Sequence, residues 1–89
     1  MATMDDWTKR LLDKYRREQQ ALVNVLQERI KWHRMQSEKT KDADEKQAHE
    51  ELLLTDLDTL EELRDKYELQ QKRFKKRYKF TLPTLDISI

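Results

Sequence analysis

The chain contains no cysteine and no glycine, and it has only one proline. Without cysteine, disulfide bonds, thiolate metal ligands and cysteine nucleophiles are all excluded. Without glycine, neither a phosphate-binding loop nor the sharp turn that carries a hydrolase nucleophile is available. Tight β-turns also depend on glycine and proline, and strong helix formers make up most of the chain. These absences predict a mostly helical protein and argue against an enzyme.

Long apolar segments are missing as well. Hydrophobic residues make up 36% and charged residues 42% of the 89 residues, and the formal net charge is +1. The apolar side chains are enough to line one side of a helix but not to fill an enclosed core, so we expect the chain to need a partner or a second copy of itself. No window approaches the roughly 18 apolar residues of a membrane span, and the N-terminus has no signal-like apolar run. We therefore expect a soluble, intracellular protein.

An apolar repeat with alternating steps of four and three residues runs through the second half of the chain. Its eight positions are Leu53, Leu57, Leu60, Arg64, Tyr67, Gln71, Phe74 and Tyr78. This spacing is typical of a helix that presents one narrow stripe to a partner helix. We predict a helix over about residues 42–79, with Asp42 as a candidate N-cap.

The first half shows a similar pattern and predicts a helix over about residues 5–38, with Asp5 as a candidate N-cap. Its apolar stripe consists of Trp7, Leu11, Tyr15, Leu22, Leu26, Ile30 and His33. Further apolar residues fall off this stripe, namely Leu12, Val23, Val25, Trp32 and Met35. Because one facing helix does not cover so wide a surface, we expect a second contact face.

The periodicity stops over residues 36–46, where one alanine is the only apolar residue. Either a turn between antiparallel helices or the exposed middle of one long helix would explain this. We favour a turn at 39–41, because an isolated long helix buries too little surface to be stable. The predicted fold is an all-α, antiparallel two-helix coiled-coil hairpin that self-associates into a four-helix bundle. The predicted helix–helix seam consists of Leu11, Tyr15, Leu22, Leu26, Leu53, Leu57, Leu60, Tyr67, Phe74 and Tyr78.

The two ends of the chain differ from the hairpin. Residues 1–4 are predicted to be disordered. Residues 80–89 are predicted to form an extended apolar tail, since Pro83 breaks a helix and the last four residues alternate as a strand does. This tail either folds back on the hairpin, adds to the sheet edge of a partner, begins a larger domain or stays disordered.

Charges are distributed unevenly along the predicted hairpin. Residues 42–62 contain nine acids and one base, and they face a mainly basic segment of the first helix. Such complementary charges are expected to fix the register of the two helices. The opposite end of the hairpin carries a basic patch of Lys9, Arg10, Arg16, Arg17, Lys72, Arg73, Lys75, Lys76, Arg77 and Lys79. Aromatic residues are interleaved with the bases from Lys72 to Phe80, a pattern that suits phosphate contacts and base stacking but also suits a solvated helix end, an acidic protein or an anionic membrane.

His33 and His49 are expected to lie at the same level of the hairpin, near Glu45. The histidine and glutamate spacings of helical metal sites are absent, so we interpret the two histidines as ordinary interface residues and predict no metal and no cofactor.

We predict a non-enzymatic protein-interaction module, such as a scaffold, an adaptor or a chaperone-like subunit of a complex. Its predicted contacts with another protein are Trp7, Trp32, Met35, Leu82, Leu85, Ile87 and Ile89. The alternative is a nucleic-acid-binding module that uses residues 72–80 together with residues 9–17.

Overall fold

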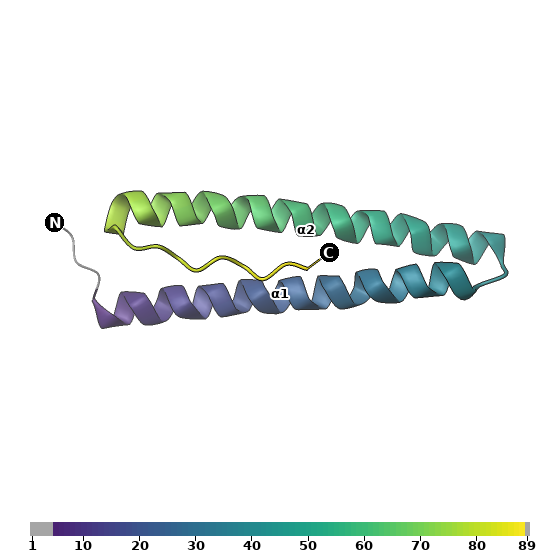
Figure 1. Ribbon diagram of the computed structural model, residues 1–89, viewed down its shortest axis with the longest axis horizontal. Helices are drawn as coiled ribbons and strands as arrows, with labels where there is room; N and C mark the ends of the chain where they lie inside the picture. The colour runs from purple at the N-terminus through teal and green to yellow at the C-terminus, as the bar shows by residue number, and fades with distance from the viewer. Residues whose placement is uncertain (1–4, 89) are drawn as a thin grey trace.

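The computed structural model describes residues 5–88, which form two long helices and an extended tail (Figure 1). Helix α1 spans Asp6–Lys39 and helix α2 spans Ala43–Tyr78. The helices lie antiparallel in a molecule whose Cα extents are 61 × 18 × 15 Å. Residues 5–88 contain no strand, so the predicted all-helical hairpin is confirmed. The disorder predicted for residues 1–4 and the partner contact predicted for Ile89 lie outside the described residues.

Both helices begin at the aspartates that the sequence suggests as N-caps. The Asp5 side chain accepts a hydrogen bond of 2.7 Å from the Thr8 backbone N–H, and this bond lowers the pKa of the Asp5 carboxyl. Asp42 caps α2 in the same way by accepting a hydrogen bond of 2.9 Å from the backbone N–H of Asp44. Each carboxylate satisfies an amide that has no partner within its helix.

The turn between the helices occupies residues 40–42 and closes without glycine. The Thr40 backbone N–H donates to the Gln36 carbonyl and completes the end of α1. Across the turn, the Thr40 hydroxyl donates a hydrogen bond of 2.8 Å to the Glu45 carboxylate. These side-chain bonds join the end of α1 to the first turn of α2, so a left-handed residue is not needed here.

Seven-residue spacing also describes the surface that the two helices bury against each other. On α1 the buried residues are Leu12, Val23, Leu26, Ile30, His33 and Ser37. On α2 the buried or half-buried residues of the corresponding line are Leu53, Asp56, Leu60, Leu63, Tyr67 and Phe74. This seam is the contact between the two helices of the hairpin.

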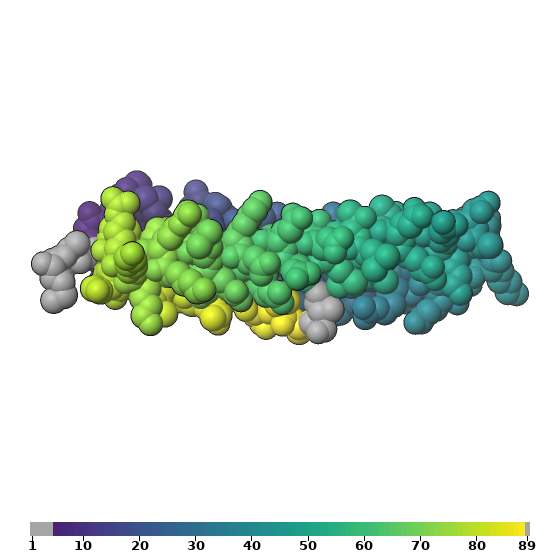
Figure 2. All heavy atoms as spheres, turned by 90° about the horizontal axis from the view of Figure 1, so that it is seen from above, coloured from purple at the N-terminus to yellow at the C-terminus, as the bar shows by residue number. Residues whose placement is uncertain are grey.

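The tail, residues 80–88, is part of the core. Helix α2 ends at Lys79, which has left-handed backbone angles of φ 57° and ψ 25°, and the chain then reverses. The tail runs back along the space between the helices (Figure 1) and shows in yellow along one edge of the molecule in Figure 2. Leu82 is only 1% exposed and packs with Leu12 and Tyr67, while Leu85 contacts both apolar clusters of the hairpin. Of the arrangements considered for this segment, the structure adopts the folded-back one.

Within residues 5–88, neither helix contains a stretch that is long and apolar enough to cross a lipid bilayer.

Candidate functional site

The tail divides the surface of the hairpin into two faces. The helix residues that meet the tail lie one position after seam residues, and they include Gln20, Gln27, Leu57, Arg64 and Gln71. In an antiparallel pair, positions one after the seam on both helices turn to the same side, and positions one before the seam turn to the other side. We call the side with the tail the tail face and the opposite side the open face.

The open face carries a line of exposed apolar side chains on each helix. Its members are Leu11, Leu22, Val25 and Trp32 on α1 and Leu52 and Leu69 on α2, each between 47% and 55% exposed. A groove of about 540 Å³ lies between the helices on this side, and its lining includes Tyr15, Gln19, Leu63, Leu69 and Gln70. Apolar residues that are grouped in this way commonly mark an interaction surface.

The residues predicted for the helix–helix seam occupy several environments. Leu26, Leu60 and Tyr67 are buried. Those that are half-buried are Tyr15, Leu53, Leu57, Phe74 and Tyr78. Leu11 and Leu22 are about half exposed on the open face, next to the buried Leu12 and Val23. Leu57 packs against the seam cluster and lines the same pocket as Ile87 of the tail, because it lies one position after Asp56.

The residues predicted to contact a partner also separate into two groups. Trp7, Trp32 and Met35 are exposed, with 66%, 48% and 43% of their surface accessible. Leu82, Leu85 and Ile87 instead pack against the protein's own helices. The described tail residues therefore already make contacts with the helices of the same chain, whereas the two tryptophans remain accessible to solvent.

The basic patch gathers at the end of the hairpin opposite the turn. All of its predicted residues are exposed except Arg16, which is half-buried. Lys72, Lys75, Lys76 and Lys79 line one shallow depression at the end of α2. The Arg77 guanidinium lies 5.4 Å from the centre of the Tyr78 ring, a cation–π distance.

A polar cluster interrupts the apolar seam toward the turn. Arg29 Nη2 donates a hydrogen bond of 2.8 Å to Oδ1 of the buried Asp56, and Nε2 of His33 lies 3.8 Å from Oδ2 of the same carboxylate. The Nδ1 atoms of His33 and His49 are 3.0 Å apart and form a hydrogen bond in which one ring donates to the other. The Trp32 ring stands edge-on to both imidazoles, with centroid distances of 5.1 and 5.2 Å, and covers them from the open face.

The two histidines do meet, as expected, but Glu45 bonds to Thr40 rather than to them. Residues 5–88 contain no group of three or more histidine, cysteine, aspartate or glutamate side chains arranged to hold a metal ion. The cluster is therefore a polar contact between α1 and α2, closed by one ion pair and one imidazole pair.

Sequence reasoning missed the side chains that hold the tail. Gln20 Nε2 donates to the Asp86 carbonyl at 2.9 Å, and Gln20 Oε1 accepts from the Asp86 N–H at 2.7 Å. Gln27 accepts from the Ser88 N–H at 2.7 Å, and Gln71 donates to the Leu82 carbonyl at 2.8 Å. A signal exists in the sequence for Gln27 alone, which follows the apolar Leu26, because Gln20 and Gln71 each follow another glutamine. It is weak, since glutamine is equally common on solvated helix surfaces.

Comparison of the chain with protein-family models, with curated proteins and with solved structures gave no match.

Proposed function

We propose that this protein is a non-enzymatic scaffold subunit whose open face pairs with a second copy to form an antiparallel four-helix bundle. The observation that carries the proposal is the contrast between the two faces. The tail covers one side of the hairpin from the end of α2 to the level of Gln27, whereas Leu22, Val25 and Leu69 remain about half exposed on the other side. A second hairpin placed on the open face would bury this apolar line and complete a four-helix core.

Charge favours an antiparallel arrangement of the two copies. Residues 23–60, which form the half of the hairpin near the turn, carry nine acids and six bases, and the rest of the chain carries nine acids and thirteen bases. Two hairpins stacked with their turns side by side would bring like net charges together. Reversing one hairpin places the acidic half of each copy against the basic half of the other, and complementary potentials of this kind select orientation.

The size of the open face fits a stable interface. A standard interface buries roughly 800 Å² on each partner, and the Cα extents of 61 Å and 18 Å give the side of the hairpin a length and width that accommodate a contact of this size. The twofold axis of such a dimer crosses the middle of the hairpin, where Leu22 of one copy meets Leu22 of the other. The open face thus has enough area, apolar content and charge pattern for self-association.

The test is the mass of the protein in solution, measured by light scattering behind size exclusion. We expect a species of about twice the 11.0 kDa chain mass at low and at moderate salt. Leu22→Glu should give a monomer, because the twofold axis brings two new carboxylates together. The matched control is Leu54→Glu, since Leu54 is 61% exposed but lies one position after Leu53 on the tail side.

A monomeric wild-type protein would remove the proposal. A dimer that persists in Leu22→Glu would show that the open face is not the contact surface. Circular dichroism of both variants separates loss of association from loss of folding.

The four-lysine depression supports a second candidate function, nucleic-acid binding. Lys72, Lys75, Lys76 and Lys79 present their charges together, and contacts with phosphates should weaken steeply as salt rises. We expect single-stranded oligonucleotides to bind at low salt and Lys75→Glu with Lys76→Glu to abolish that binding. Binding that the double substitution leaves intact would exclude this candidate.

A further inference from the structure

The helices hold the tail through its apolar side chains and also through hydrogen bonds to its backbone. Five hydrogen bonds join helix side chains to the tail backbone. Gln20, Gln71 and the Tyr67 hydroxyl donate to the carbonyls of Asp86, Leu82 and Pro83. The N–H groups of Asp86 and Ser88 donate to Gln20 and Gln27. Gln20 makes both a donor and an acceptor bond with Asp86, so its side-chain amide does what a neighbouring β-strand would do. Any extended peptide offers the same main-chain groups, so these bonds do not depend on the identity of the tail side chains.

Besides the half-buried Phe80 at its start, the tail packs three apolar side chains against the helices. Leu82 is buried and Leu85 and Ile87 are half-buried, whereas the residues between them are exposed. The three apolar residues are therefore spaced by three positions, from Leu82 to Leu85, and then by two positions, from Leu85 to Ile87. We call the space between the helices that receives these side chains the tail groove.

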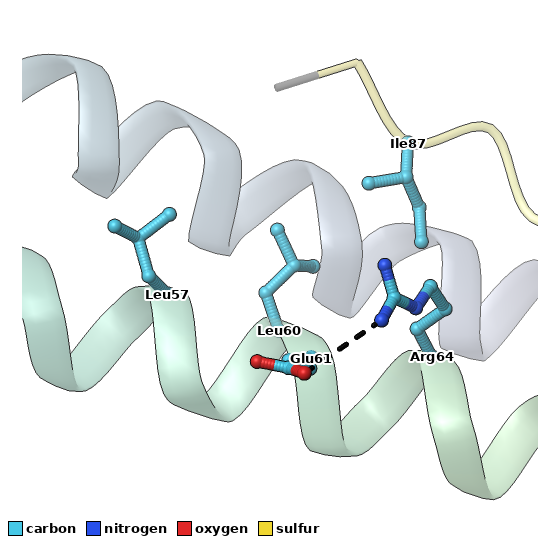
Figure 3. Close-up of a pocket in the computed structure, with 5 residues that line it drawn as sticks. All are labelled: Leu57, Leu60, Glu61, Arg64 and Ile87. Carbon is cyan, nitrogen blue, oxygen red and sulfur yellow. Dashed lines mark ion pairs between the residues drawn. The ribbon is translucent and has the colours of Figure 1, made fainter.

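The tail does not fill the groove. A cavity of about 480 Å³ lies beside Ile87, between it and Leu57, Leu60, Glu61 and Arg64 of α2 (Figure 3). Figure 3 shows Leu57 and Leu60 directed into this space, with the Glu61–Arg64 ion pair of 3.9 Å along its side. A second cavity of about 230 Å³ adjoins Leu85 and Thr84. The larger volume lies within the range of about 300–1,000 Å³ that is usual for ligand sites, so a larger apolar side chain than Ile87 would fit better.

We propose that the tail groove is a binding site for an extended apolar segment of a partner protein, and that the tail occupies it as an intramolecular competitor. The partner segment presents a free backbone to Gln20, Gln27 and Gln71 and places a large apolar side chain beside Leu57 and Leu60. The tail of a second copy is disfavoured as the occupant, because exchange through Lys79 would bring two strongly basic hairpin ends together. The proposal concerns the tail face and does not depend on dimerisation through the open face.

The probe is a fluorescent peptide with the sequence of residues 80–89 in which phenylalanine replaces Ile87. It is titrated into the full-length chain, and the side-chain amide signals of Gln20, Gln27 and Gln71 are followed by NMR. We expect weak binding to the wild type and about tenfold tighter binding to Leu82→Ser, because apparent affinity scales with the fraction of molecules whose groove is empty. The glutamine amide signals should shift in both proteins.

A second variant keeps the test decisive if Leu82→Ser does not fold. Ile87→Phe in the full chain fills the cavity from within, strengthens the competitor and should weaken binding of the peptide by about tenfold. Leu22→Glu on the open face is the control and should leave peptide binding unchanged, which separates this proposal from the dimer. The proposal is overturned if the peptide does not bind the wild type, if Ile87→Phe binds it as well as the wild type does, or if the glutamine amides do not respond.

Discussion

Asp56 and Arg29 form an ion pair whose two members differ greatly in exposure. The Asp56 side chain is 3% exposed, whereas the Arg29 side chain is 55% exposed. If the pair is broken, Arg29 is free to turn to water, but the carboxylate remains within the seam. The cost of losing one partner therefore depends on which partner is removed.

Arg29→Met should destabilise the hairpin by about 2–3 kcal/mol, because it retains most of the aliphatic stem but leaves the buried carboxylate without its strongest donor. Asp56→Leu should cost less, and the double substitution should recover most of the loss. Urea unfolding followed by circular dichroism measures these differences. The control is Arg34→Met on the exposed surface of α1, which should change stability by less than about 0.5 kcal/mol. Equal effects of Arg29→Met and Arg34→Met would contradict the assigned role.

Tyr67 makes the free energy of unfolding depend on pH in the alkaline range. Burial raises the pKa of the Tyr67 phenol, and the neutral hydroxyl donates to the Pro83 carbonyl. Because the folded pKa lies above the unfolded value of about 10, the folded state binds this proton more tightly. The contribution of Tyr67 is complete below about pH 10 and is lost as the pH rises through the folded pKa.

We expect Tyr67→Phe to be less stable than the wild type by about 1 kcal/mol at neutral pH, through loss of one hydrogen bond. The difference should shrink as the pH is raised above about 10, because only the wild type then has to ionise a buried phenol. Chemical unfolding at a series of pH values measures the difference, and Tyr15, which burial shifts in the same direction, is present in both proteins. A difference that stays constant with pH would show that Tyr67 ionises without affecting the fold.

At the scale of elements, the sequence indicates the helices well and their faces less well. Three local signals are sufficient to predict the hairpin. They are the lack of glycine, the aspartates that cap the helices and the polar stretch near residue 41. The face of α2 is harder, because Asp56 occupies a seam position and Leu57 the position beside it. Within the seam, the Asp56 carboxylate is paired with Arg29 on the other helix, and such a long-range contact is not visible in the pattern of one helix.

The tail is the other element that sequence patterns do not place. Its alternation predicts an extended segment, but whether that segment folds back depends on glutamines more than sixty residues away in the chain. A glutamine on the helix surface gives the same sequence pattern whether its side chain bonds to water or to a backbone amide, so the pattern does not show that it holds the tail. Only the position of the tail distinguishes the two sides of the hairpin, so the sequence does not indicate which side is the open face.

Leu82→Ala tests the tail as a structural layer. Leu82 is 1% exposed between the helices, so its truncation should cost about 2–4 kcal/mol through lost burial and a residual cavity. The exposed Leu54 is the control, and Leu54→Ala should change stability by less than about 0.5 kcal/mol. Thermal unfolding monitored by circular dichroism gives both values. A melting temperature that is unchanged in Leu82→Ala would mean that the tail adds little to the fold in solution.

At the scale of the whole molecule, the hairpin is an elongated body with opposite net charges at its two ends. Residues 43–60 of α2 carry six acids and one base, and residues 61–78 carry four acids and seven bases. In the proposed antiparallel dimer, the two α2 helices cross the interface in opposite directions, and each acidic half lies over a basic half. Charge pairing between α1 and α2 of one chain does not explain the uneven distribution of charge along α2, because charged residues are distributed more evenly along α1.

Reversing charges at one end and then at the other tests this arrangement. One variant carries Glu45→Lys and Glu51→Lys, and the other carries Arg73→Glu and Lys76→Glu. Each variant alone should dimerise about tenfold more weakly at low salt, because like charges then face each other across the interface. An equimolar mixture should recover the wild-type affinity as a heterodimer, since the new lysines of one chain oppose the new glutamates of the other. Sedimentation velocity measures both effects, and added salt should reduce them. Hairpins stacked with their turns together would instead place like charges against like charges in the wild type and in each variant alone, so neither variant would weaken the dimer and the mixture would associate more tightly than the wild type.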